Sequence, residues 1–134
     1  MQAFSPAPFL GFLDGLALAR FDPPADVQRR GDIVAIHGLT RQKRDFDYIG
    51  AALAAAGWRF FAFDAPGRGE SLRLAPEEYH LGRYAEIFIQ LMERHFAAPV
   101  HWIGTSMGGL IALEISAQGR ADDFASLTLV DITH

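Results

Sequence analysis

Short apolar runs alternate along the chain with segments in which apolar residues recur at helical spacing. The runs predict strands, because most are continuous, β-branched or aromatic, and bounded by Gly, Pro or Asp. They cover residues 15–21, which alternate only weakly, and 33–36, 58–63, 100–103 and 127–130. Apolar residues at helical spacing predict a helix over 45–56, one that begins near residue 76, and one over 107–118.

The order of these elements indicates the fold class. Strands that alternate with helices of about a dozen residues favour right-handed βαβ crossovers. We therefore expect an α/β protein, a mainly parallel sheet with flanking helices, in a single domain over residues 1–134. Asp45 is expected to cap the first helix, Gly57 to end it, and Pro76 to stand in the first turn of the second.

Composition narrows the class of function. Half of the 134 residues are hydrophobic and 21% are charged, which excludes disorder as the main state. The net charge of −4 argues against a nucleic-acid partner. The chain has no cysteine, so disulfides and thiolate metal sites are excluded. Neither a secretion signal nor a run of about 18 apolar residues is visible, so we expect a cytoplasmic protein without a membrane contact.

Residues 104–108 read Gly-Thr-Ser-Met-Gly, a G-x-S-x-G motif between a predicted strand and a predicted helix. In that context the serine of such a motif stands on a sharp bend as a nucleophile. Ser106 is therefore the predicted nucleophile, and the Met107 amide at the helix start is a predicted oxyanion donor. The alternative is a small-residue turn in which Ser106 merely caps the helix.

A second loop is expected at the same edge of the sheet. Residues 37–40 follow the first buried strand, and loops after parallel strands meet at one edge. The Leu39 amide is therefore a second predicted oxyanion donor. His37, between a strand end and a glycine turn, is interpreted as a structural histidine bonded to loop backbone rather than as a base.

Three motifs in this order resemble the α/β-hydrolase superfamily, in particular its small serine esterase-like members. They are His-Gly-Leu-Thr at 37–40, Asp-Ala-Pro-Gly-Arg-Gly-Glu-Ser at 64–71 and Gly-Thr-Ser-Met-Gly-Gly at 104–109, and the resemblance runs from about residue 9 to 132. By this resemblance, residues 64–71 shape the pocket wall and are not catalytic. It also implies hydrolysis of esters, thioesters, amides, lactones or carbon–carbon bonds, with no cofactor and no metal.

The chain differs from the family pattern after the predicted strand at 127–130. The family's acid and histidine follow the nucleophile on later strands, whereas this sequence ends at His134. One substitute triad has the right order: Ser106, Asp131 as acid and His134 as base. The alternative is that both residues belong to a plain strand-end loop, and His80, His95 and His101 are interpreted as surface residues.

An incomplete α/β-hydrolase fold would leave the strand at 127–130 as an exposed edge. We therefore expect a fragment of a longer protein, a homodimer or complementing C-terminal segment that covers the edge, or a poorly stable chain. The leading hypothesis is a serine hydrolase that cleaves a small carboxylic ester or related acyl bond through an acyl-enzyme. The alternatives are a non-catalytic fragment or interaction module, and a hydrolase-fold enzyme of another reaction type, such as a carbon–carbon hydrolase or a lyase.

Overall fold

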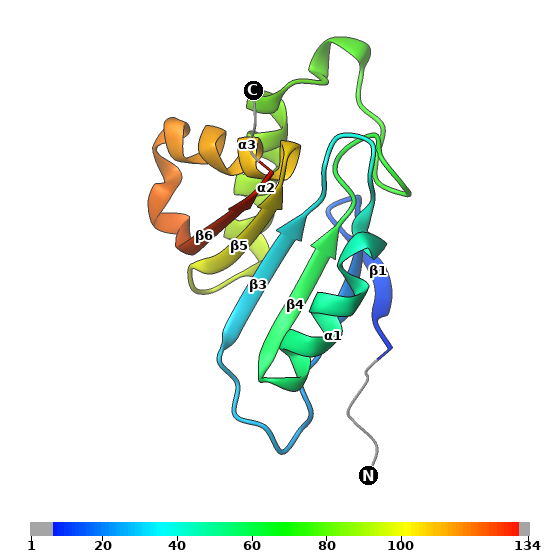
Figure 1. Ribbon diagram of the computed structural model, residues 1–134. Coiled ribbons are helices and arrows are strands. Elements are labelled where there is room, and N and C mark those ends of the chain that lie inside the picture. The colour runs from blue at the N-terminus through cyan, green and yellow to red at the C-terminus, as the bar shows by residue number, and fades with distance from the viewer. Residues whose placement is uncertain (1–6, 132–134) are drawn as a thin grey trace.

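The computed structural model describes residues 7–131 as one sheet with helices on both faces (Figure 1). The six strands are β1 (Phe9–Leu13), β2 (Leu16–Phe21), β3 (Gly31–Ile36), β4 (Trp58–Phe63), β5 (Val100–Thr105) and β6 (Phe124–Val130). The α-helices are α1 (Asp47–Ala55), α2 (Leu81–His95) and α3 (Met107–Ile115). Short helical turns cover η1 (Lys43–Phe46), η2 (Pro76–Glu78), η3 (Ser116–Arg120) and η4 (Ala121–Asp123).

The strand order is β1-β2-β4-β3-β5-β6. Strands β4, β3, β5 and β6 run parallel, and β1 and β2 form an antiparallel hairpin at one edge. This is the mainly parallel α/β sheet that the alternation of elements predicted. The loops after the parallel strands consequently gather at one edge, at the top in Figure 1.

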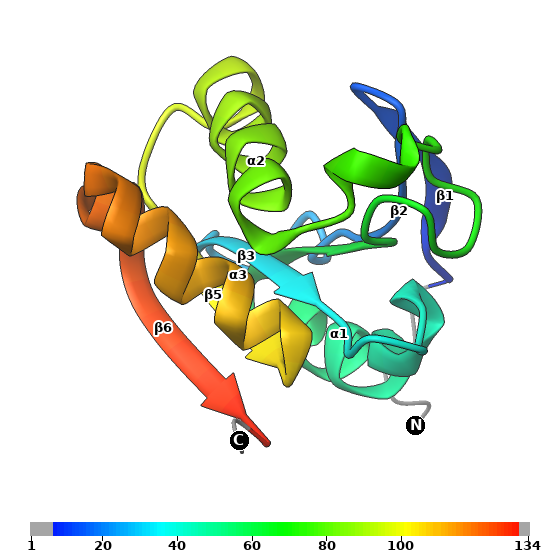
Figure 2. The same cartoon turned by 90° about the horizontal axis from the view of Figure 1, so that it is seen from above.

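Two apolar layers hold the sheet between its helices. Seen from above, α1 lies on one face, and α2 and α3 lie on the other (Figure 2). The apolar run of β3 is continuous because the strand is buried on both faces. Val34 and Ile36 pack in the layer under α2 and α3, whereas Ile33 and Ala35 pack in the layer under α1. A parallel strand buried on both faces needs apolar side chains at successive positions.

The hairpin of β1 and β2 was not predicted as a pair, because only residues 15–21 were interpreted as a strand. The two-residue turn between the strands is Asp14-Gly15, and both residues have positive φ, 51° and 81°. That combination is the type I′ turn that matches strand twist, and Asp-Gly is one of its preferred sequences. The Asp-Gly pair was therefore the signal for β1 in the sequence.

Three predicted helix boundaries are wrong by a few residues. Asp45 does not cap α1: its carboxylate accepts a hydrogen bond from Arg41 Nε at 2.7 Å, and α1 follows the short η1 turn. Pro76 begins the η2 turn only, and α2 begins after His80, whose Nδ1 accepts from the Arg83 amide at 3.2 Å. The regular part of α3 ends at Ile115 and continues as the wider η3 turn.

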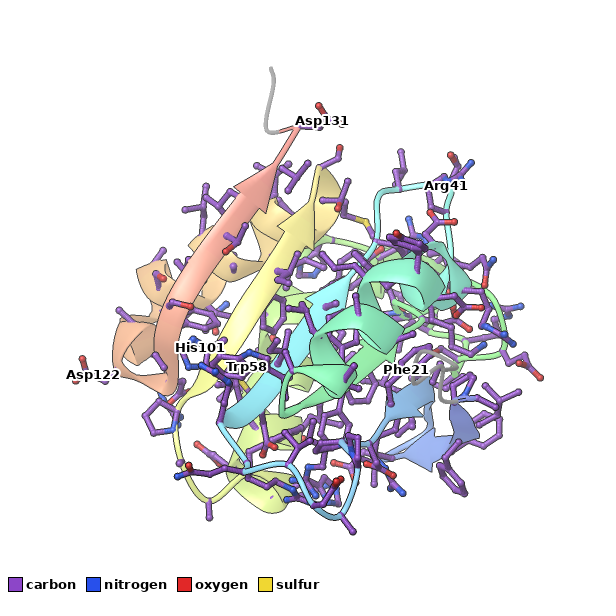
Figure 3. The ribbon with its side chains drawn as sticks, turned by 60° about the horizontal axis from the view of Figure 1, so that its bottom comes forward. Phe21, Arg41, Trp58, His101, Asp122 and Asp131 are labelled. Carbon is purple, nitrogen blue, oxygen red and sulfur yellow. The ribbon has the colours of Figure 1, made fainter. Side chains whose placement is uncertain are left out.

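Strand β6 is the second edge of the sheet within the part of the chain that the structure describes. Its apolar side chains Leu127, Leu129 and Val130 are 38–42% exposed, which agrees with the expected exposed edge. Figure 3 shows the face that carries α1: the helix lies over β4, while no described helix covers this face of β5 and β6. His101 on this face is half-buried, its ring 4.8 Å from that of Trp58.

Candidate active site

The bend between β5 and α3 holds Ser106 in a backbone conformation that L-residues rarely adopt. Its φ is 51° and its ψ is −110°, whereas the next residue begins α3. The Ser106 amide donates to the Val130 carbonyl at 2.7 Å, and the Ser106 carbonyl accepts from the amides of Gly109 and Leu110. These bonds on both sides fix the strained geometry. The side chain itself is exposed and makes no hydrogen bond to the described residues.

Glycines on either side of Ser106 let strand and helix approach closely. A Cβ on Gly104 would lie 2.5 Å from the carbonyl carbon of Gly108, and a Cβ on Gly108 would overlap the Ile36 carbonyl. Trp102 Nε1, buried beneath the bend, donates to the Gly108 carbonyl at 3.1 Å. Only glycine fits at positions 104 and 108, so the sequence motif follows from the packing of the bend.

The first turn of α3 leaves its leading amides without intrahelical acceptors. The Met107 amide directly follows Ser106 and has no hydrogen-bond acceptor among residues 7–131. The loop after β3 lies beside it: a Cβ on Gly38 would be 3.6 Å from Ser106 Cβ. Leu39 follows in this loop and lines the same cleft as Ser106. The arrangement therefore brings both predicted oxyanion-donor residues to the serine.

His37 is fully buried and bonded through both ring nitrogens. Its Nδ1 donates to the Gly38 carbonyl at 2.6 Å, and its Nε2 accepts from the Ala65 amide at 3.0 Å. Burial lowers the pKa of His37, although the Gly38 carbonyl opposes this effect. The ring therefore joins the β3 loop to the β4 loop, which agrees with the structural interpretation and leaves no nitrogen free to act as a base.

The turn at residues 64–71 is organised by a buried carboxylate. Asp64 accepts hydrogen bonds from the Lys43 amide at 2.8 Å, from Lys43 Nζ at 2.9 Å and from the Glu70 amide at 3.1 Å. Ser71 Oγ donates to the Asp64 carbonyl and accepts from the Ala17 amide at 2.9 Å. The buried polar side chains of the motif, Asp64 and Ser71, thus bond inside the fold, as expected of a structural turn.

A cleft of about 620 Å³ opens above Ser106. Its walls come from the loops after β3 and β4, from the segment between η2 and α2, and from the first turns of α2 and α3. Tyr79 and Tyr84 supply aromatic surface, and Arg68 supplies a charge. The sequence predicted neither tyrosine as a cleft residue, and it placed Arg68 only within the structural motif. His80, expected on the surface, is exposed but also lines this cleft.

The two remaining predicted residues lie at the end of β6. Asp131 has a φ of 55°, is exposed, and directly follows the carbonyl that accepts from the Ser106 amide (Figure 3). Its carboxylate has no hydrogen-bond partner among the described residues. His134 lies outside the described residues. Topology therefore brings the backbone at Asp131 beside the serine bend.

The sheet, its two helical layers and the serine bend after β5 are the architecture of an α/β hydrolase. Comparison with known proteins agrees: residues 33–134 match the family described as the alpha/beta hydrolase fold. The chain belongs to this family. The match covers all three motifs that carried the resemblance in the sequence.

Individual relatives include a 3-hydroxybutyrate-oligomer hydrolase of Cupriavidus necator, 36% identical over 84% of this chain and 40% of that protein. The dihydrolipoyllysine-residue acetyltransferase component of an acetoin cleaving system of Pseudomonas putida is 32% identical over 96% of this chain and 34% of that protein. The thioesterase domain from the curacin biosynthetic pathway has a similar structure, with a TM-score of 0.75, 25% identity, and coverage of 92% of this chain and 45% of that one. The chain thus spans less than half the length of each.

Two further observations concern ligands and membranes. Within residues 7–131, the structure has no cluster of His, Asp and Glu side chains that could hold a metal ion. No helix in that same range is both long and apolar enough to span a bilayer.

Proposed function

We propose that this chain carries the nucleophile and oxyanion part of a serine hydrolase that cleaves a small carboxylic ester or related acyl bond. The carrying observation is the exposed Ser106 in its strained bend, at the floor of a cleft and at the start of α3. The names of the relatives support hydrolytic acyl chemistry in general. The covalent mechanism and the ester substrate are our inference from the geometry.

In the proposed reaction Ser106 Oγ attacks the carbonyl carbon of the ester, and its proton passes to a base. The carbonyl oxygen becomes an oxyanion, to which the amides of Met107 and Leu39 donate. One well-placed donor of this kind lowers the activation barrier by about 3 kcal/mol. Collapse expels the alcohol, which takes the proton from the base, and leaves the acyl group on Ser106. Water then attacks the acyl-enzyme, and the acid leaves as Ser106 regains its proton.

The proposed reaction also requires a general base for Ser106 and an acid that orients this base. Asp131 and His134 have the right chain order, and Asp131 follows the strand that hydrogen-bonds the serine bend. Because the chain spans 40% of the length of the hydrolase from Cupriavidus necator, a further segment is the other source of the base. Removing the acid from such a triad costs about 10⁴-fold in rate and removing the base about 10⁶-fold, while the oxyanion donors and binding retain some catalysis.

A fluorophosphonate tests the nucleophile directly, because an activated serine displaces its fluoride and becomes covalently phosphonylated. We expect intact-mass analysis to show one adduct on the chain, at Ser106, and none on Ser106→Ala. The matched control is Ser116→Ala, which removes the hydroxyl that donates to the Ala112 carbonyl on the last turn of α3 and should still be labelled. An adduct that persists in Ser106→Ala would refute the assignment.

Hydrolysis of 4-nitrophenyl acetate separates the leading function from another reaction type. The leading function requires release of 4-nitrophenol that disappears in Ser106→Ala. A chain that is labelled at Ser106 but does not hydrolyse the ester would favour a carbon–carbon hydrolase or a lyase.

The exposed β6 edge favours a second candidate function, an interaction module that binds a partner through strand addition. The same edge is where we propose that a second copy of the chain or a complementing C-terminal segment pairs. A chain that is folded by circular dichroism, forms a complex through this edge and resists the fluorophosphonate would support the module over the enzyme.

A further inference from the structure

Arg68 reaches from the turn after β4 into the cleft and is held there by its neighbours. Its Nε donates to the Leu39 carbonyl at 3.1 Å, and one terminal nitrogen donates to the Pro66 carbonyl at 2.9 Å and to Tyr84 Oη at 3.0 Å. The guanidinium carbon lies 5.5 Å from the centre of the Tyr84 ring. The side chain therefore has a defined position beside the Leu39 loop.

All three of these acceptors are neutral, so none of them balances the charge of Arg68. A guanidinium carries five N–H donors, and the second terminal nitrogen has no acceptor among the described residues. No Asp or Glu lines the cleft within residues 7–131. The acids on the neighbouring loops bond other cations, since Asp45 bonds Arg41, and Glu70 and Asp64 both bond Lys43. Arg68 thus lines the cleft without an ion-pair partner among the described residues.

We propose that Arg68 makes the cleft selective for esters that carry a carboxylate, a proposal that rests on the hydrolase function above. A hydrogen bond from a guanidinium nitrogen to a carboxylate is strengthened by the opposite charges, and the second terminal nitrogen of Arg68, already fixed in place, loses little side-chain entropy on binding. The acyl or alcohol part that enters the cleft therefore bears an ionised carboxyl group, as in a half-ester of a dicarboxylic acid or a short oligomer of a hydroxy acid.

A purely structural role for Arg68 makes a different prediction. If the guanidinium only supports the Leu39 carbonyl, its loss weakens binding of charged and neutral esters alike. If it binds a carboxylate, its loss removes the preference for the charged ester. The ratio of the two affinities therefore separates the two roles, and Arg68→Lys, which keeps the charge without the planar fork, separates charge from geometry.

The test uses two non-chromogenic esters of nearly equal shape, monomethyl glutarate and dimethyl glutarate, titrated at pH 7.5 into the Ser106→Ala chain and followed by NMR. We expect the charged monoester to bind about tenfold tighter than the diester, as for a hydrogen bond to a charged group. Adding Arg68→Gln should bring the ratio close to one, and Arg68→Lys should keep part of it.

Arg73→Gln is the matched control. Arg73 lies on the same loop, is exposed, and donates to the Gly69 carbonyl at 3.1 Å without lining the cleft. Removing this charge should leave the ratio unchanged. Equal affinities for the two esters, absence of binding by both, or a preference that survives Arg68→Gln would each overturn the proposal. Because the titration is done without the serine hydroxyl, it does not depend on the labelling result that tests the nucleophile.

Discussion

Because the backbone at Ser106 is strained, we expect glycine to be more stable than alanine at position 106, whereas at Ser116, at the end of α3, we expect the reverse. A φ of 51° with a ψ of −110° is a conformation that glycine adopts freely and other residues adopt at a cost of about 1–3 kcal/mol. Glycine loses about 0.5–1 kcal/mol more backbone entropy on folding than alanine. The net expectation is that Ser106→Gly is about 1 kcal/mol more stable than Ser106→Ala.

Alanine is the correct reference at this position. The hydroxyl of Ser106 makes no hydrogen bond to the described residues, and its side chain is exposed, so both variants lose the same contacts. Only the backbone preference differs between them. The same pair at Ser116, where φ is −62° and ψ is −41°, should show the reverse order, because glycine in a helix costs about 1 kcal/mol relative to alanine.

Urea unfolding followed by circular dichroism measures both pairs. A shift of the midpoint at constant slope reports stability alone, and a difference of about 1 kcal/mol corresponds to roughly 3 °C in Tm for a chain of this size. The reasoning fails if Ser106→Gly is no more stable than Ser106→Ala while the Ser116 pair shows the ordinary helical order. The residue would then carry no backbone strain in solution.

Two more predictions concern buried polar groups of the loops. Burial lowers the pKa of His37 from 6.5, so the ring contributes stability above that pH that is lost as the pH falls and the unfolded chain takes up a proton. His37→Gln should flatten the fall in unfolding free energy between pH 7.5 and 5, by at most about 1.4 kcal/mol per pH unit, and equal slopes in the two urea series would contradict this. Asp64→Asn leaves the buried Lys43 without its main counter-ion and should cost about 3 kcal/mol, whereas Glu70→Gln, whose carboxylate is exposed, should cost under about 1 kcal/mol by thermal unfolding. Similar losses in both carboxylate variants would refute the buried pairing.

The sequence was most informative where local chemistry and packing point the same way. The continuous apolar run at 33–36 predicted a strand buried on both faces, and β3 packs against both apolar layers. The Gly-Thr-Ser-Met-Gly motif at 104–108 predicted a sharp strand–helix bend, and side chains on Gly104 and Gly108 would overlap backbone. Helix boundaries failed where side-chain partners were not visible, as at Asp45, which bonds Arg41 instead of the helix end.

Sequence alone determined the class of fold and the position of the serine bend, because hydrophobic periodicity and a glycine-flanked serine act over a few residues. Tertiary structure alone decided the composition of the cleft. Arg68 meets Leu39, and Tyr84 meets Arg68, only because the loops after β3 and β4 and the start of α2 converge at one edge of a parallel sheet. Such contacts join residues that are far apart in the chain, so no local pattern encodes the position of Arg68 in the cleft.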